Sequence, residues 1–353
     1  MAGGAEPLVC VLTPVYNGEK LLAGCIRSVL EQTYTNFQYI IVNNRSTDRT
    51  LEIAESFAKQ DSRIRIHDNT DFLNVVDNHN MAFSLIPEGA KYSKNVDADD
   101  WIFPNCLAEL VKRAEEYPTV GMVTSYVMCG RGRVGWTGLP YPSNFMKGSD
   151  VCRLRLLNGV KVFGGPSASL LRASVVKEQA PFYKLDNYHG DTEAYLDLLQ
   201  KYDFGFVHQV LSYNREGGDD SLTTGFLERV NSYPVADIEE LVKFGPAYLT
   251  KEEHETRLRE TICKYYKMLA QSVLERRNKE FWDYHRSRLK VVGMRIDRFR
   301  LGRNVLYRIA DYIFNPKRTV EGLWRMLFKK GRPANPNPRP VAGPETEAHE
   351  TGS

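Results

Sequence analysis

The chain has 353 residues, 42% of them hydrophobic and 26% charged, and a formal net charge of +3. This composition is typical of a folded globular protein, and the length favours one large domain with an appendage or two domains over a single small domain. No apolar run is long enough to cross a bilayer, and no secretory signal opens the chain. The cysteines are scattered and lack the spacing of zinc ligands. We therefore expect a cytoplasmic protein whose thiols are reduced.

Short apolar runs alternate with amphipathic stretches through the first hundred residues. The expected strands are 8–12, 37–42, 64–66 and 92–96, and the expected helices are 21–30, 51–58 and 74–85. This alternation predicts an α/β fold with a mostly parallel sheet and helices on both of its faces. Ligands of such sheets bind at the edge where the strands end, so side chains that follow the strands are the first candidates for a site.

The rest of the chain is less regular. Glycine and proline are frequent over 130–165, which predicts loops, and strand-like runs return at 169–176 and 203–211. From about residue 227 to about residue 328, the apolar residues recur at the spacing of a helix. We therefore expect an α/β domain over residues 1–226, a helical and basic extension over 227–330, and a disordered, proline-rich tail over 331–353.

Three carboxylates follow the fourth expected strand, in the run Asp97-Ala98-Asp99-Asp100. Carboxylates packed this closely repel one another unless a cation lies between them. Oxygen ligands of this kind suit Mg²⁺ or Mn²⁺, which also bind substrate phosphates, so the run predicts a site for a metal with a nucleoside diphosphate. An acidic turn or helix cap would give the same pattern, and the run by itself does not decide between them.

Six segments follow one another over about residues 8–225. They begin at Thr13-Pro14-Val15-Tyr16-Asn17, Ser28-Val29-Leu30-Glu31-Gln32, Ile41-Val42-Asn43-Asn44, Val96-Asp97-Ala98-Asp99-Asp100-Trp101, Gly165-Pro166-Ser167 and Gly190-Asp191-Thr192-Glu193. In this order and spacing they resemble the family 2 glycosyltransferases. The resemblance implies a GT-A fold and a metal-dependent, inverting hexosyltransferase that moves a sugar from a nucleotide-diphosphate sugar to an acceptor hydroxyl. It also implies a UDP-sugar as the default donor and a saccharide or lipid-linked acceptor, in the synthesis of cell-surface polysaccharide or glycolipid.

The resemblance assigns nucleotide contacts to the loop after the first strand. Pro14, Tyr16 and Asn17 match the positions that hold the nucleotide, with Tyr16 flanking the base. Asn78 matches a variable helix start that can contact the substrate, and His79 beside it is interpreted as structural. Pro14, Tyr16 and Asn17 could also be no more than the entry loop of the next helix.

Asn43 and Asn44 depart from the family pattern, which usually has two aspartates at these positions. An amide both donates and accepts hydrogen bonds, whereas a carboxylate only accepts them. The base preference of this chain can therefore differ from that of its relatives.

The resemblance implies that the acidic run binds the metal. Asp97 would lie against the ribose and the metal and Asp99 would bind the metal directly, with Ala98 between them in the nucleotide-sugar site. Asp100 could share this role or cap a helix that starts near Pro104, and the sequence leaves both open.

Asp191 matches the family's catalytic acid and is the expected general base, which would accept the proton of the acceptor hydroxyl. An N-cap of the following helix is its alternative role. Glu193 is the second candidate base. His189 is close enough in the chain to tune Asp191 or to touch the metal, and its alternative interpretation is a solvated loop residue. The loop 215–221 occupies the place of a family segment that approaches the diphosphate or the acceptor.

A rival function is a nucleotide-sugar-binding or scaffold protein of the same fold without activity. The joint presence of Asp97, Asp99 and Asp191 argues against it, because a protein that only binds needs no base. A nucleotidyltransferase or a dehydrogenase would need a glycine-rich phosphate loop after a strand, which Pro14-Val15-Tyr16-Asn17 is not.

The basic end of the chain suggests a polyanionic partner. Residues 286–332 hold 14 Lys or Arg and 3 acids, and apolar faces recur between the basic positions of 303–330. Such helices either lie peripherally on an anionic membrane or pack on the catalytic domain with a solvated basic rim, and both interpretations stay open. No nucleic-acid-binding module accompanies the patch, so no nucleic acid is expected.

Overall fold

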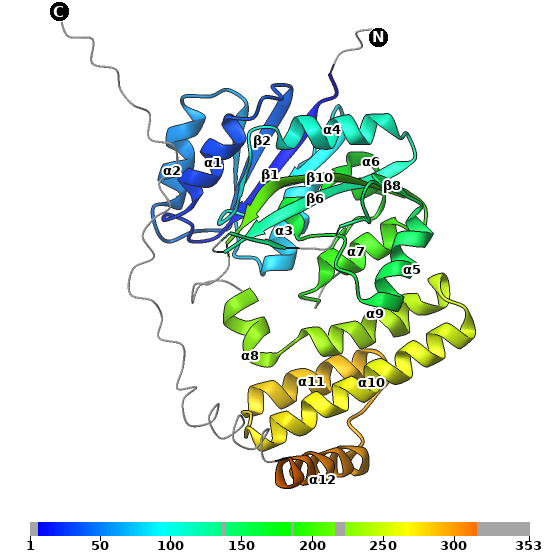
Figure 1. Cartoon of the computed structure of the whole chain (residues 1–353). Helices are drawn as coiled ribbons and strands as arrows, with labels where there is room; N and C mark the ends of the chain where they lie inside the picture. The colour runs from blue at the N-terminus through cyan, green and yellow to red at the C-terminus, as the bar shows by residue number, and fades with distance from the viewer. Residues whose placement is uncertain (1–5, 131, 136–137, 185–186, 216–222, 316–353) are drawn as a thin grey trace, which may run out of the picture. The chain divides into compact units, whose positions relative to one another are not determined.

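The computed structural model describes residues 6–130, 132–135, 138–184, 187–215 and 223–315. Its sheet has ten strands in the order β3-β2-β1-β4-β9-β6-β10-β5, with β7 and β8 at the margins (Figure 1). The strands are β1 (Val9–Val15), β2 (Phe37–Asn43), β3 (Ile64–Asp68), β4 (Tyr92–Asn95), β5 (Trp101–Ile102), β6 (Val120–Cys129), β7 (Arg133–Gly135), β8 (Phe145–Met146), β9 (Leu170–Arg172) and β10 (Asp203–Asn214).

The first four strands are parallel and have the order that a doubly wound sheet requires. Val9 of β1 pairs with Phe37 of β2 on one side and with Tyr92 of β4 on the other. All seven residues of β1 are buried, which explains why its sequence is a continuous apolar run instead of an alternating one. The strand order reverses at β1, and this is where the ends of β1, β2 and β4 can receive a ligand.

The second half of the sheet is mixed. β6 and β10 are parallel to each other, and β9 runs antiparallel between β4 and β6. The ten strands with their flanking helices confirm the predicted α/β class with a mixed, mostly parallel sheet.

Helices cover both faces of the sheet. Those that flank it are α1 (Leu22–Leu30), α2 (Thr50–Ala58), α3 (Val75–Ser84), α4 (Cys106–Glu116), α5 (Gly148–Asn158), α6 (Ala173–Glu178) and α7 (Gly190–Leu198), with a 3-10 turn at Pro166–Ala168. Alternate residues of β1 point to the two faces: Val9 and Val11 pack with α1, α2 and α4, whereas Cys10 and Leu12 belong to the core that α3, α5, α6 and α7 cover (Figure 1).

Two expectations about the middle of the chain were wrong. The expected strand 169–176 is a strand only as far as Arg172, and the rest is α6. The region 130–165, expected to be loops, contains β7, β8 and α5. The glycines bracket α5 without breaking it, since Gly148 opens the helix and Gly159, with a left-handed φ of 65°, ends it.

Gly148 is required by packing, and a substitution there should show it. A Cβ at Gly148 would overlap the backbone carbonyl oxygens of Leu199 and Tyr202, which cannot rotate away, whereas a Cβ at Gly24 of α1 would meet nothing within 4 Å. We expect Gly148→Ala to lower the free energy of unfolding by about 3 kcal/mol or more. Gly24→Ala should raise it by about 0.5–1 kcal/mol, because alanine favours a helix. Urea denaturation measures both, and a Gly148→Ala variant as stable as the parent would contradict the packing described.

The C-terminal part of the described chain is helical, as predicted. It comprises a short π-helical turn at Thr223–Leu227, then α8 (Glu228–Val230), α9 (Tyr233–Tyr248), α10 (Lys251–Leu274), α11 (Lys279–Val291) and α12 (Arg298–Phe314). The predicted tail 331–353 and the expected helical segment 316–330 lie outside the described residues. Among the helices that the structure describes, none is both long and apolar enough to span a membrane.

The chain divides into two compact units. The first contains the described residues up to Tyr265 together with Asn278–Ile296, and the second contains Tyr266–Arg277 and the described residues from Asp297 onward. The domain boundary expected at 226/227 stays a prediction, since α8, α9 and α11 cluster with the sheet in the first unit.

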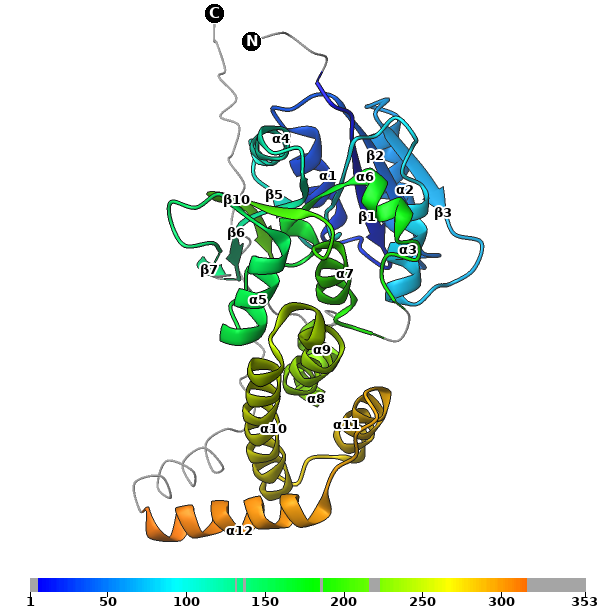
Figure 2. The ribbon, with the colours of Figure 1, turned by 90° about the vertical axis from the view of Figure 1, so that its right-hand side faces the viewer.

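Ion pairs attach α9 to its neighbours in the first unit. Glu240 binds Arg155 of α5 at 2.8 Å, Glu239 binds Arg288 of α11, and Lys243 binds Glu193 of α7. Figure 2 shows α5, α7 and α9 close together. Because both partners of the Arg155–Glu240 pair are largely shielded from water, the pair fixes the position of α9 as well as neutralising its charge.

Candidate active site

The loop after β1 is tied to the loop after β2. Asn17 has a left-handed φ of 50°, which asparagine tolerates better than most residues. Its side-chain oxygen accepts a hydrogen bond from the backbone N–H of Thr47 at 2.8 Å, and its own N–H donates to Ser46 Oγ at 3.0 Å. Pro14 lies inside β1 and is buried, so it shapes the exit of the strand.

Tyr16 forms an exposed aromatic pair with Phe72, a residue that the sequence analysis missed. The ring centroids are 4.9 Å apart in an edge arrangement, and 48% of Tyr16 and 60% of Phe72 are exposed. Two exposed aromatic rings beside the strand ends provide an apolar surface on which a base can stack. Phe72 lies in the loop between β3 and α3, and nothing local in the sequence relates it to Tyr16.

Asn43 and Asn44 have hydrogen-bond partners within the protein. Asn43 donates to Asp68 Oδ1 at 2.7 Å, which places a carboxylate from the end of β3 next to the amide. Asn44 donates to the Leu73 carbonyl at 2.7 Å and accepts from Asn69 Nδ2 at 3.0 Å. Asp68 is exposed, whereas both asparagines are buried, so Asp68 is the more accessible acceptor at this point.

Asn78 belongs to the same buried amide network. Its Oδ1 accepts a hydrogen bond from Asn69 Nδ2 at 2.9 Å, and Asn69 also binds Asn44. The network joins the loops after β2 and β3 to α3. It fixes the walls of the site, and only 4% of Asn78 is exposed.

Asp97 is held from three sides. Asn95 Nδ2 donates to its Oδ1 at 2.7 Å, its backbone N–H donates to Ser167 Oγ at 3.0 Å, and His79 Nε2 lies 3.2 Å from Oδ1. Burial would raise the pKa of Asp97, but the hydrogen bond and charge of His79 outweigh it and lower that pKa below the ordinary value. Asp97 is therefore an ionised carboxylate.

His79 faces hydrogen-bond acceptors with both ring nitrogens. Nδ1 lies 2.8 Å from the Val75 carbonyl oxygen, which can only accept, so Nδ1 carries a proton, and Nε2 faces the Asp97 carboxylate. Burial opposes a positive charge, but the Asp97 contacts and the Val75 carbonyl raise the pKa of His79 overall. The expected structural role of His79 is thus incomplete, because the residue also sets the charge of Asp97.

Asp99 and Asp100 both contact Arg215, Asp99 at the Arg215 side chain and Asp100 at the Arg215 backbone. Asp99 is partly exposed and lies 3.6 Å from Arg215 Nε, and burial with the neighbouring Asp97 charge raises its pKa. Asp100 is buried and accepts a hydrogen bond from the backbone N–H of Arg215 at 2.9 Å. Burial and the charges of Asp97 and Asp99 raise the pKa of Asp100 well above its ordinary value.

The helix-cap alternative for Asp100 was wrong. α4 begins at Cys106 and the residue before it is Asn105, so Asp100 is too far along the chain to cap it. Of the loop 215–221, only Arg215 is among the described residues.

Lys94 supplies a buried positive charge beneath the acidic run, and the sequence analysis did not identify it. The residue is fully buried in β4, and its Nζ donates to the Asn95 carbonyl at 3.0 Å and to the Ser167 carbonyl. The available signal was a lysine in a strand that the sequence predicts to be buried. Burial lowers the pKa of Lys94, while the nearby carboxylates favour its charged form.

The acidic run is chemically suited to a divalent ion. Within the described residues, no three His, Cys, Asp or Glu side chains form a complete metal cluster. Magnesium and manganese commonly bind to one or two protein carboxylates and complete their shell with substrate phosphates and water. Asp97 is ionised and Asp99 is partly exposed, so this pair fits such a shared site.

Asp191 lies in the first turn of α7. His189 is the residue that precedes the helix, so Asp191 is not the N-cap, although its Oδ1 accepts a hydrogen bond from the Thr192 N–H at 2.7 Å. Burial raises the pKa of Asp191, and the charges of Asp97 and His79 also act on it, in opposite directions. The Asp97 charge therefore reaches Asp191, although the acidic run lies more than 90 residues earlier in the chain.

Glu193 and His189 have structural partners. Glu193 is 6% exposed and binds Asn187 Nδ2 at 2.6 Å and the ammonium group of Lys243, so both its oxygens are engaged. His189 lies 3.0 Å from Ser232 Oγ and packs on Tyr233, and burial with two nearby arginines lowers its pKa to about 4. The interpretation of His189 as a solvated loop residue was wrong; it is a neutral link between α7 and α9.

Comparison with known proteins identifies a family to which the first half of the chain is similar. The sequence model described as Glycosyl transferase family 2 matches residues 10–179. An uncharacterized glycosyltransferase of Haemophilus influenzae is 29% identical over 51% of this chain and 56% of its own length. Glycosyltransferase GlyG of Streptococcus pneumoniae is 31% identical over 34% of this chain and 39% of its own length. The chain thus spans about half the length, or less, of these curated relatives.

Two solved structures share the fold. Staphylococcus aureus TarS 1–349 in complex with UDP-GlcNAc aligns with a TM-score of 0.57 and 14% identity, over 81% of this chain and 80% of that one. The mannosyltransferase PcManGT of Pyrobaculum calidifontis, in complex with GDP-Man and Mn²⁺, aligns with a TM-score of 0.53 and 15% identity, over 92% and 88%. At these identities the likeness establishes the architecture alone. The sequence match assigns residues 10–179 of this chain to the family 2 glycosyltransferases, and the shared architecture shows the GT-A fold.

Proposed function

We propose that this protein transfers a sugar from a nucleotide-diphosphate sugar to an acceptor hydroxyl, with inversion at the anomeric carbon. The observation that carries the proposal is that the segment before Asp191's helix α7 is bound to α3 by the hydrogen bonds between Asn80 and the Tyr183 backbone, and that His79 of the same α3 contacts Asp97. A base and a diphosphate site at one sheet edge are the two parts that glycosyl transfer needs.

The proposed reaction forms one bond as another breaks. The acceptor oxygen attacks the anomeric carbon from the face opposite the diphosphate, Asp191 takes the proton of the acceptor hydroxyl, and the bond from that carbon to the phosphate oxygen breaks. Burial raises the pKa of Asp191, which makes its carboxylate a stronger base than an exposed one. Asp97 and Asp99 would hold a divalent ion, which supplies positive charge to the leaving diphosphate.

Tyr16 and Phe72 are proposed to flank the base, with Pro14 and Asn17 shaping the loop. Asn43 and Asp68 would lie at the polar edge of the base, and Asn44 and Asn78 would support the wall behind it. A UDP-sugar is the default donor. The complexes of the two structural neighbours contain UDP-GlcNAc and GDP-Man, so guanine nucleotides belong in the same test.

A saccharide or a lipid-linked sugar is proposed as the acceptor, in the synthesis of cell-surface polysaccharide or glycolipid. The proposed location is the cytoplasm, at the inner face of the membrane. The alternative is a nucleotide-sugar-binding protein without activity, which would bind the donor equally well and release no nucleotide.

A donor screen tests the proposal. Thermal shift with UDP- and GDP-sugars, each with Mn²⁺ or with EDTA, should reveal one donor class that raises the melting temperature in a metal-dependent way. That donor should then be hydrolysed slowly or transferred, and NMR of the first-formed sugar should show the inverted anomer. Binding without turnover under any condition would favour the inactive alternative, and a retained anomer would reject Asp191 as a base for direct transfer.

A further inference from the structure

One face of α12 is fixed against α10 within the second unit. The Arg300 guanidinium lies over the Tyr266 ring at 4.6 Å, and Arg308 Nε and Tyr312 Oη each donate to Gln271 Oε1 at 3.1 Å. Residues 300, 304, 308 and 312 follow one another at four-residue spacing, so they share this face. The helix therefore has a defined orientation about its axis, with its opposite face turned away from α10.

That opposite face is apolar and exposed. Phe299, Leu306, Ile313 and Phe314 are 81%, 69%, 69% and 84% exposed, and no residue of α12 is buried. Positions 299, 306 and 313 are seven residues apart, which places them along one line of the helix over four turns. An apolar stripe of this length on a water-soluble surface indicates a partner.

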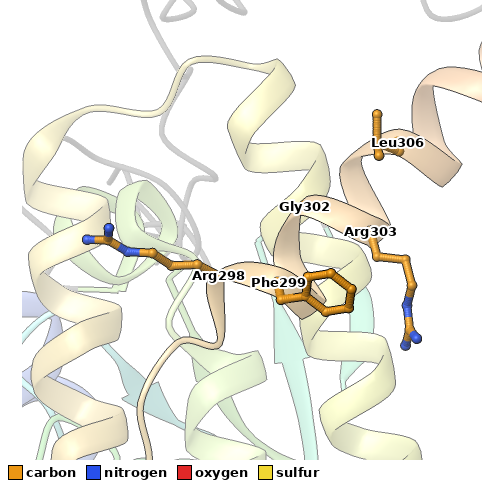
Figure 3. Close-up of a pocket in the computed structure, with 5 residues that line it drawn as sticks. All are labelled: Arg298, Phe299, Gly302, Arg303 and Leu306. Carbon is orange, nitrogen blue, oxygen red and sulfur yellow. The ribbon is translucent and has the colours of Figure 1, made fainter.

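The charges on the same surface are positive. Arg298 and Arg303 line an apolar hollow of about 330 Å³ together with Phe299, Gly302 and Leu306 (Figure 3). The space beside Gly302 is open, since a Cβ there would meet nothing within 4 Å. Neither guanidinium forms an ion pair with another described residue, and the acid within the helix, Asp311, lies on the α10 side of the stripe.

We propose that this surface of α12, defined by Phe299, Arg303, Leu306, Ile313 and Phe314, lies flat in the interface of an anionic lipid bilayer. The acyl boundary takes up the apolar side chains, and lipid phosphates bind Arg298 and Arg303 at the rim. An amphipathic helix that lies in the interface needs an apolar stripe flanked by basic residues, as Arg298 and Arg303 flank the stripe of α12 (Figure 3). Such a helix does not need the length to span the membrane. The inference does not depend on the proposed glycosyl transfer, because docking requires no donor or acceptor.

Vesicle sedimentation with the full chain tests the proposal. In low salt, the parent should pellet with vesicles of phosphatidylcholine and 30% phosphatidylglycerol and remain in the supernatant with phosphatidylcholine alone. We expect Leu306→Ser with Ile313→Ser to lower the partition coefficient at least tenfold. Arg303→Gln should lower it several-fold and weaken its salt dependence.

Matched control variants distinguish binding through this face of α12 from non-specific binding to vesicles. Val291→Ser removes an exposed apolar side chain from α11, and Lys279→Gln removes a 90% exposed charge from the same helix. Both should bind vesicles like the parent, and circular dichroism should show unchanged helicity in every variant.

Two results would overturn the proposal. The first is parent-like vesicle binding by the Leu306→Ser, Ile313→Ser variant. The second is a parent that forms dimers in lipid-free buffer, by light scattering, which the same variant abolishes while neither protein binds vesicles. Nucleotide-sugar hydrolysis, measured in detergent-free solution without lipid, should be the same in the parent and the variant, so a failure of the docking proposal is distinguishable from a failure of the proposed activity.

Discussion

Asp191→Asn is expected to lower kcat by roughly 10²–10⁴-fold, the usual contribution of a general base. Asparagine keeps the size of the side chain and an oxygen that can accept the Thr192 N–H, so α7 should still begin in the same place. The amide cannot take the acceptor proton. Nucleotide affinity should change by less than about twofold, because the base acts on the acceptor and not on the nucleotide.

The pH profile gives a second measurement of the same assignment. A base must be deprotonated to act, and burial raises the pKa of Asp191, so kcat/KM of the parent should fall on the acid side at a pH above the ordinary aspartate pKa. That limb should vanish from the residual activity of Asp191→Asn. Asp197→Asn, on the same helix but paired with Lys184 near its other end, is the matched control and should keep parent-like turnover. Equal loss of nucleotide binding and of turnover in Asp191→Asn would show that the residue holds the donor instead.

Asp99→Asn should remove the metal-dependent part of nucleotide binding. Its carboxylate is partly exposed and available to a divalent ion, and an amide is a much weaker ligand for Mg²⁺ or Mn²⁺. We expect a nucleoside diphosphate to bind at least roughly tenfold more weakly in Mn²⁺, which corresponds to about 1.4 kcal/mol of binding free energy. Calorimetry with and without metal measures this effect.

In EDTA, the same titration should show no loss of nucleotide affinity in Asp99→Asn, and a small gain is expected. Without metal, Asp99 repels the diphosphate, so Asp99→Asn should bind the nucleotide as well as the parent or somewhat better. Asp150→Asn, an exposed carboxylate in the first turn of α5, should behave like the parent in both buffers. If Asp99→Asn lost the same affinity in EDTA as in Mn²⁺, the residue would contact the nucleotide directly or stabilise the loop, and the metal assignment would be wrong.

The sequence by itself predicted the first half of the sheet and the family. β1, β2, β3 and α1 to α3 are where the apolar patterns placed them, because β1 and β2 are continuous buried runs, and the helices bury residues at a period near 3.6. The acidic run was identifiable because it follows a recognisable strand, whereas Asp191 was identified through the family resemblance.

Only the tertiary structure decided which polar groups are partners. His79 and Asp97 are 18 residues apart, Asn17 and Thr47 are 30 apart, and Asp100 meets the Arg215 backbone across 115 residues. A side chain's local pattern carries no information on such contacts, which depend on the strand order and on how loops from different strands meet at one edge. For the same reason the sequence could not predict that Asp100 accepts a hydrogen bond from the residue after β10 instead of capping α4. Nor could it predict that α5 forms between two glycines, or that Phe72 lies beside Tyr16. Each depends on burial or proximity that exists only once the sheet has assembled.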